Sequence, residues 1–228
     1  MWIKICANTN LDDAQLAVEL GADALGFVFA SSKRQVTAAE VARITPHLPH
    51  GIERVGVFDT QNADAIAGIA LEAGLTAVQL HGGVNHALAA ELAEFNERFE
   101  GRLSLIQTLH WHVDADEDSI ATVGRQLADL AAAGVVERVL IDSRVGQAGG
   151  GTGRTFNWER AKAVLAEGAG HLKLIVAGGL RPQNVAEAIR GLNPWGVDVV
   201  SGVEAHPGRK DPEKLAAFIA NARQPRAV

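Results

Sequence analysis

Residues 172–202 read LKLIVAGGLRPQNVAEAIRGLNPWGVDVVSG, and this stretch decides the fold. Two short β-branched runs, one at each end, enclose an alanine-rich amphipathic segment. Pro182 suits the first turn of a helix, and Gly191 suits its end. Strand, helix and strand in this order are typical of a βαβ unit, in which the two strands run parallel.

The same alternation runs about eight times along the 228 residues. The pattern predicts strands at 2–6, 24–29, 53–58, 76–80, 103–109, 138–142, 172–177 and 197–201. It predicts helices at 11–20, 37–47, 62–73, 86–99, 117–133, 157–167, 182–191 and 212–222. No stretch resembles a linker, so we expect one domain over residues 1–228, a (β/α)8 TIM barrel with its active site at the carboxyl ends of the strands. An open doubly wound sheet is the alternative, but ANTN follows Cys6 where that fold would carry GxGxxG.

The composition narrows the class of partner. Hydrophobic residues make up 47% and charged residues 21%, as in a globular protein with a substantial core. A net charge of −6 argues against nonspecific binding to nucleic acid. One cysteine excludes an intrachain disulfide, and we find no long apolar run. We therefore expect a cytoplasmic protein that has neither nucleic-acid nor membrane partners.

The first expected strand, WIKIC at 2–6, ends in the one cysteine of the chain. Because side chains alternate along a strand, Lys4 and Cys6 share one face, and Ile3 and Ile5 share the other. An amine and a thiol at a strand end make Cys6 a candidate catalytic residue. The alternative is a buried cysteine that behaves as a small hydrophobe.

Other strand ends supply further candidates. Asp142 ends the run VLID, where its carboxylate would face the barrel mouth, although aspartate also caps turns at such positions. Arg34, in SSKRQV, could bind a carboxylate through two hydrogen bonds or could be a solvated surface residue. The spacing of His81, His110 and His112 suggests no convincing ligand cluster, so we expect no metal.

Glycine pairs follow the last two expected strands, in AGGL at 177–180 and SGVE at 201–204. In barrel enzymes these two loops often bind phosphate through backbone N–H groups, and glycine permits the close approach. The sequence thus predicts a phosphorylated small-molecule ligand, with tight turns as the structural alternative. GGGTG at 149–153 could form a lid over the same ligand.

A set of motifs in the expected order resembles the phosphoribosylanthranilate isomerase family of tryptophan biosynthesis. They are IKIC (3–6), GADALGFVF (21–29), SKR (32–34), RVGVF (54–58), VQLHG (78–82), LID (140–142), GGTGRTFNW (150–158), AGGL (177–180) and VDVVSGVE with PGRKD (197–211). The resemblance extends from residue 3 to about residue 220 and is far more specific than any one motif.

The resemblance implies an Amadori rearrangement of N-(5-phosphoribosyl)anthranilate to 1-(o-carboxyphenylamino)-1-deoxyribulose 5-phosphate, without a cofactor. It makes Asp142 the general acid and Cys6 the general base. It places Arg34 on the anthranilate carboxylate and His81 in the substrate-binding set. The phosphate would then contact the backbone at the residues of the two late loops, Gly178, Gly179, Ser201 and Gly202.

Ala7 replaces the glycine that usually follows the base in this family, which raises the question of whether that position needs a positive φ. The rivals are a catalytically silent sugar-phosphate-binding barrel and a differently specific one, such as the histidine-pathway isomerase, which has an aspartate where this chain has Cys6. Monomer and homodimer both remain possible.

Overall fold

A computed structural model describes residues 1–98, 103–144 and 155–224. Eight parallel strands close into a barrel in chain order. They are β1 (Trp2–Ile5), β2 (Ala24–Val28), β3 (Glu53–Phe58), β4 (Ala77–Leu80), β5 (Ser104–His112), β6 (Arg138–Arg144), β7 (Lys173–Val176) and β8 (Gly196–Val199). The pairing of β1 with β8, which matches Lys4 to Asp198, completes the circle. The predicted (β/α)8 barrel is therefore confirmed.

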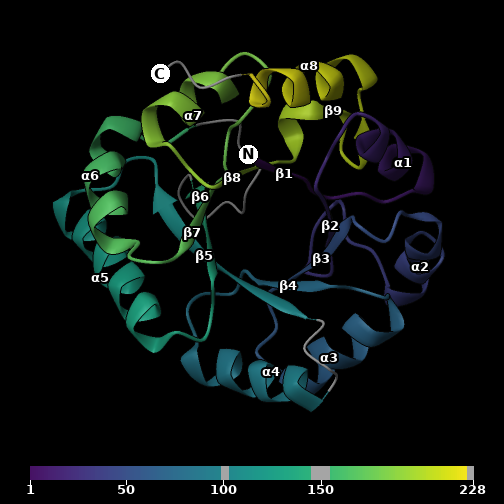
Figure 1. The fold of residues 1–228 in the computed structure, drawn as a ribbon, viewed down its shortest axis with the longest axis horizontal. Helices are drawn as coiled ribbons and strands as arrows, with labels where there is room; N and C mark the ends of the chain where they lie inside the picture. The colour runs from purple at the N-terminus through teal and green to yellow at the C-terminus, as the bar shows by residue number, and fades with distance from the viewer. Residues whose placement is uncertain (99–102, 145–154, 225–228) are drawn as a thin grey trace.

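Helices follow the strands and form a ring around them (Figure 1). They are α1 (Leu11–Glu19), α2 (Ala38–Ala42), α3 (Ala63–Glu72), α4 (His86–Arg98), α5 (Glu117–Ala133), α6 (Trp158–Gly168), α7 (Val185–Leu192) and α8 (Pro212–Ala222). Polar side chains cap their first turns: Asn10, Asn62 and Asn157 each accept a backbone N–H. Thr37 and Glu40 form the complete capping box that begins α2.

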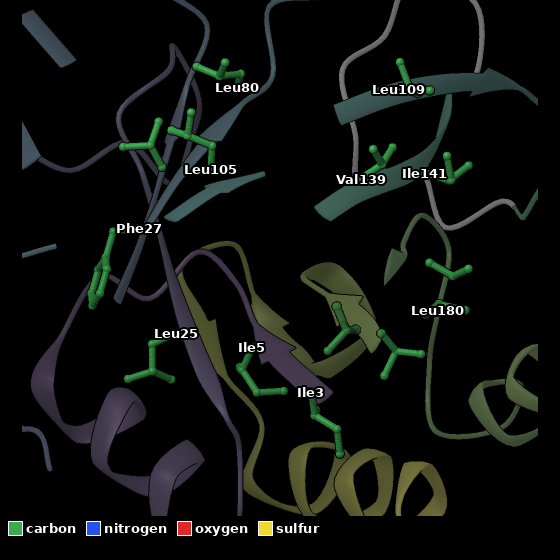
Figure 2. Packing of buried hydrophobic residues seen from close by; sticks show 14 of the residues in the cluster. Ile3, Ile5, Leu25, Phe27, Leu80, Leu105, Leu109, Val139, Ile141 and Leu180 are labelled. Atoms are coloured by element: carbon green, nitrogen blue, oxygen red, sulfur yellow. The ribbon is translucent and has the colours of Figure 1, made fainter. Parts of the chain in front are cut away.

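The alternation of side chains divides the core into two parts. Outward-facing residues such as Ile3, Ile5 and Phe27 pack in the layer between barrel and helices, where Figure 2 shows side chains from several strands. A smaller cluster fills the barrel interior and consists of Ala24, Val55, Ala77, Ile106, Leu140, Ile175 and Ala177. The interior is thus packed with side chains and is not a pore.

Aromatic and charged groups close the barrel at the amino ends of the strands. Trp2 and Trp195 stack with ring centroids 5.2 Å apart, and the Arg138 guanidinium lies over both rings. Arg138 also makes two 2.7 Å hydrogen bonds to the Glu53 carboxylate. These contacts leave the opposite end of the barrel for the site.

The structure departs from the predicted elements most clearly in three places. Strand β5 continues to His112, so His110 lies in a strand and not in a loop. The segment predicted as a helix at 37–47 divides into α2 and the 3-10 turn η1 (Thr45–His47). After β8, a 3-10 turn η2 (Ser201–Val203) leads into an unpredicted hairpin of β9 (Glu204–His206) and β10 (Arg209–Lys210).

Among the described helices, none is both long enough and apolar enough to cross a membrane. The glycines predicted to form a lid, residues 149–153, lie outside the described part of the chain.

Candidate active site

Cys6 lies immediately after β1, at the carboxyl end of the barrel. Its backbone N–H donates to the Val199 carbonyl at 2.9 Å, and its side chain is almost completely buried. A glycine in the next strand makes room for the side chain: a Cβ atom at Gly26 would lie 3.0 Å from the Cys6 Cα and would overlap the sulfur. Gly26 thus fixes where the thiol can lie, a role that the sequence analysis missed.

The backbone turns sharply after Cys6. Ala7 has a φ of +61°, in the left-handed region that favours glycine. Asn8 holds the turn, because its side-chain amide donates to the Ile5 carbonyl at 2.7 Å and to the Gly26 carbonyl at 3.2 Å. The position that usually holds glycine in the family therefore does require a positive φ here, and alanine adopts it.

Lys4 lies beside both the Cys6 thiol and the Asp198 carboxylate. Its ammonium lies 2.9 Å from Asp198 Oδ1, and both side chains are buried. Burial alone would lower the pKa of Lys4, but the Asp198 charge and contact with Cys6 hold it above its ordinary value. Burial raises the pKa of the Cys6 thiol, and the charges of Lys4 and Lys210 counteract only part of that rise.

Asp142 lies in β6, near the carboxyl end of that strand, and is 8% exposed. Since all eight strands are parallel, Asp142 and Cys6 belong to the same end of the barrel. Asp142 is paired in register with His110 of β5. The His110 Nε2 atom is 3.1 Å from the His81 carbonyl oxygen, so this nitrogen is the protonated donor.

His81, His110 and Asp142 each offer one ligand atom, and these atoms all lie within 4.8 Å of one another. Such a group could hold a divalent metal ion, because imidazole and carboxylate are common ligands. Sequence spacing could not reveal it, since His81 follows β4 while His110 lies in β5 and Asp142 lies in β6. The grouping also places two imidazoles beside the carboxyl group that we predicted to act as an acid.

The two late glycine loops lie against other parts of the chain. Gly178 and Gly179 both have positive φ, +81° and +66°. A Cβ atom at Gly178 would collide with Ser143, and one at Gly202 would collide with the Leu180 carbonyl oxygen. The loops after β7 and β8 therefore touch each other through bare backbone, which gives these glycines a structural reason besides the predicted phosphate contact.

Arg34 follows β2 and already has a carboxylate partner. Its Nε atom lies 2.8 Å and its Nη2 atom 2.6 Å from the two oxygens of Glu204. The Glu204 hydrogen bonds raise the pKa of Arg34 further. Glu204 and Lys210 lie within the motifs SGVE and PGRKD, but nothing in the sequence indicated a role for either residue.

Comparison with known proteins gives one consistent family. The family model described as N-(5'phosphoribosyl)anthranilate (PRA) isomerase matches residues 3–221. The protein named N-(5'-phosphoribosyl)anthranilate isomerase in Pelobacter propionicus is 40% identical over 226 residues, which are 99% of this chain and 97% of that relative.

Solved structures agree with the sequence comparison. The crystal structure of phosphoribosyl anthranilate isomerase from Thermotoga maritima superposes with a TM-score of 0.82 at 35% identity and covers 98% of both chains. A second structure of the enzyme, in complex with reduced 1-(o-carboxyphenylamino)-1-deoxyribulose 5-phosphate, has a TM-score of 0.78 at 34% identity and also covers 98% of both chains.

Proposed function

Since the chain belongs to the N-(5'-phosphoribosyl)anthranilate isomerase family, we propose that it rearranges N-(5-phosphoribosyl)anthranilate with Asp142 as general acid and Cys6 as general base. The reaction is an Amadori rearrangement, an aldose-to-ketose isomerisation in tryptophan biosynthesis. The observation that supports this proposal most strongly is a family match over nearly the whole chain, in which a thiol and a carboxyl group lie at the carboxyl end of one parallel barrel. That match favours this activity over a silent barrel or a histidine-pathway isomerase.

The acid acts first. Asp142 donates a proton to the ribose ring oxygen, the C1–O bond breaks, and the amine nitrogen forms a Schiff base with C1. A carboxyl group must be protonated in order to donate a proton. Asp142 is 8% exposed and lies beside the imidazoles of His81 and His110.

The base acts second. The Cys6 thiolate removes the proton from C2, which gives an enolamine that tautomerises to the ketone. A buried thiol with a raised pKa is ionised in fewer molecules at neutral pH, but each thiolate is a stronger base. Lys4 supplies a positive charge that favours the thiolate, so a larger fraction of the molecules is ionised than burial alone would allow. Each proton transfer can contribute about 10²- to 10⁴-fold in rate.

The remaining predicted residues bind substrate. Arg34 holds the anthranilate carboxylate, and His81 lies beside Asp142 at the same end of the barrel. The backbone N–H groups of the loops after β7 and β8 bind the 5-phosphate. Gly179 and Ser201 lie next to the point where these two loops touch each other. Left-handed glycines point successive N–H groups to one side and suit an anion.

Anthranilate fluorescence tests the assignment. The wild-type protein should convert the substrate, whose anthranilate fluorescence then falls, and both Cys6→Ser and Asp142→Asn should lose about 10²-fold or more in kcat. Asp64→Asn, on the exposed side of α3, is the matched control and should match the wild type. Activity that survives in either site variant would remove that residue from its role, and binding without turnover by the wild type would favour a silent barrel.

A further inference from the structure

The β9–β10 hairpin brings two buried charges between Arg34 and Cys6. Figure 1 shows β9 beside α8, on the side of the barrel where α1 lies. The side chain of Glu204 is 4% exposed and that of Lys210 is fully buried, and their charged atoms are 3.8 Å apart. Lys210 also donates to the Cys6 carbonyl oxygen. Charges buried this completely are rare unless they are paired, so the hairpin is a built charge network.

Glu204 binds one particular edge of the Arg34 guanidinium. Its carboxylate accepts from Nε and Nη2, at 2.8 Å and 2.6 Å. A guanidinium offers two edges suited to a carboxylate, one formed by Nε with Nη2 and one formed by Nη1 with Nη2. The second edge stays available, because Nη1 donates no hydrogen bond to any of the described residues. Glu204 therefore leaves Arg34 able to bind a second carboxylate.

The hairpin and helix α8 both hold Glu204 in place. The Gly208 N–H donates to Glu204 Oε1 at 3.1 Å, and the Lys214 ammonium donates to the Glu204 carbonyl at 2.9 Å. Burial alone would raise the pKa of Glu204, but the Arg34 hydrogen bonds and the Lys210 charge bring it below its ordinary value. Glu204 thus remains ionised at neutral pH and acts as a fixed anchor for a long, flexible side chain.

Lys210 completes the network on the side of Cys6. Its ammonium lies 3.8 Å from Glu204 Oε1 and donates to the Cys6 carbonyl oxygen. Its backbone N–H donates to the Asp13 carboxylate at 2.8 Å. Glu204 thus connects the Arg34 guanidinium to a buried lysine that lies beside Cys6.

We propose that Glu204 is a positioning residue, which locks the Arg34 guanidinium so that its Nη1–Nη2 edge is ready for the anthranilate carboxylate. The inference rests on the role of Arg34 proposed above. It predicts that Glu204 matters for substrates that carry the carboxylate and not for substrates that lack it. Preorganisation of this kind saves the ordering of an arginine side chain when substrate binds.

Two substrates separate this role from a structural one: N-(5-phosphoribosyl)anthranilate and N-(5-phosphoribosyl)aniline, which lacks only the carboxylate. Glu204→Gln keeps the shape but turns an N–H group toward the guanidinium. We expect kcat/KM for the anthranilate substrate to fall about 10- to 100-fold, mostly through KM, because Arg34 is no longer held in place to bind the substrate carboxylate. For the aniline substrate the fall should stay below about 3-fold. Glu204→Asp, which retains the charge, should recover part of the loss.

A binding measurement checks the same point without catalysis. The affinity for reduced 1-(o-carboxyphenylamino)-1-deoxyribulose 5-phosphate should fall by a similar factor in Glu204→Gln. Glu91→Gln, on the exposed side of α4, is the matched control and should leave both substrates and the affinity unchanged. Thermal unfolding of each variant shows whether it is folded at the assay temperature.

The possible outcomes distinguish a failure of the positioning role of Glu204 from a failure of the proposed function. Equal losses on both substrates in Glu204→Gln would overturn the positioning role and make Glu204 a scaffold residue. Arg34→Met should show the carboxylate-selective loss more strongly; equal losses there would overturn the role of Arg34 and the inference together. No turnover of the anthranilate substrate by the wild type would instead contradict the proposed function itself.

Discussion

The sulfur of Cys6 occupies the space that a side chain at Gly26 would fill, because a Cβ atom built there overlaps it and lies 3.0 Å from the Cys6 Cα. Gly26→Ala should therefore displace the thiol and lower kcat by about 10²-fold, the effect expected of a shift near 1 Å at a reacting group. Gly68→Ala is the matched control, since nothing lies within 4 Å of a Cβ at that exposed helix position. Steady-state kinetics that show unchanged kcat in Gly26→Ala would mean that the thiol can relocate freely.

The left-handed backbone at Ala7 makes a second prediction. A β-branched side chain is poorly accommodated at φ +61°, so Ala7→Val should lower the free energy of unfolding by about 2–3 kcal/mol. Ala7→Gly relieves strain but loses a buried methyl group and adds entropy to the unfolded chain, so its net effect should stay within about 1 kcal/mol. Denaturant unfolding of the two variants measures both, and equal stability of Val and Gly variants would argue against the strained turn.

The Lys4–Asp198 pair should tune the Cys6 thiol in opposite directions. The Lys4 charge lowers the thiol pKa and the Asp198 charge raises it. Lys4→Met should therefore raise the pKa of Cys6, and Asp198→Asn should lower it. Because the base must be deprotonated, the rise of kcat/KM with pH should move to higher pH in the first variant and to lower pH in the second.

Thiol alkylation against pH gives the Cys6 pKa directly. The chain has one cysteine, so the label reports a single group. Shifts of the same sign in both variants, or an unchanged pKa in Lys4→Met, would remove Lys4 from any role in tuning the base.

The contacts of Arg138 at the amino end of the barrel should affect the stability of the fold and not the activity. Arg138 bonds Glu53 and covers two tryptophans, at the end opposite Cys6 and Asp142. Arg138→Met should lower the free energy of unfolding by about 1–3 kcal/mol, because the Glu53 carboxylate loses its partner. The loss stays in this range because water still reaches part of the Glu53 side chain. Its kcat should equal that of the wild type. Arg125→Met, on an exposed helix face, is the control and should change neither the free energy of unfolding nor kcat. A large fall in kcat for Arg138→Met would contradict the prediction, because it would mean that the amino end of the barrel affects the site at the carboxyl end.

Local pattern was enough to predict the barrel. The alternation of β-branched runs with alanine-rich segments predicts eight strands within a few residues of their observed ends, because each run must bury one or both faces. The local pattern failed where pairing with residues far away in the sequence decides how long a strand is. Strand β5 extends through His110 and His112 because β6 pairs with it as far as Arg144, and Trp111 stacks on Phe156. Polar residues at that position suggested a loop.

Helix ends show the same limit. Gly191 was predicted to end its helix, but α7 continues to Leu192 and Asn193 takes the left-handed position. Both residue types tolerate that conformation, so the choice depends on packing.

The candidate site was only partly accessible from sequence. Strand-end position predicted Cys6 and Asp142, because parallel strands bring their carboxyl ends together. Arg34 was predicted from the loop after the second strand, because a guanidinium suits a carboxylate. Glu204 was missed because its partner Arg34 is 170 residues away and the hairpin that carries it has no periodic pattern. Gly26 was missed because the atom that needs its space belongs to another strand.

The division of labour between Cys6 and Asp142 is tested most directly by the isotope effect on kcat/KM for substrate deuterated at C2. In the proposed mechanism, Asp142 acts in ring opening and Cys6 acts in C2 proton removal. The isotope effect should therefore increase in Cys6→Ser, where proton removal limits the rate, and should fall toward unity in Asp142→Asn, where ring opening limits it. The reverse pattern, or the same isotope effect in both variants, would contradict the assignment of base and acid.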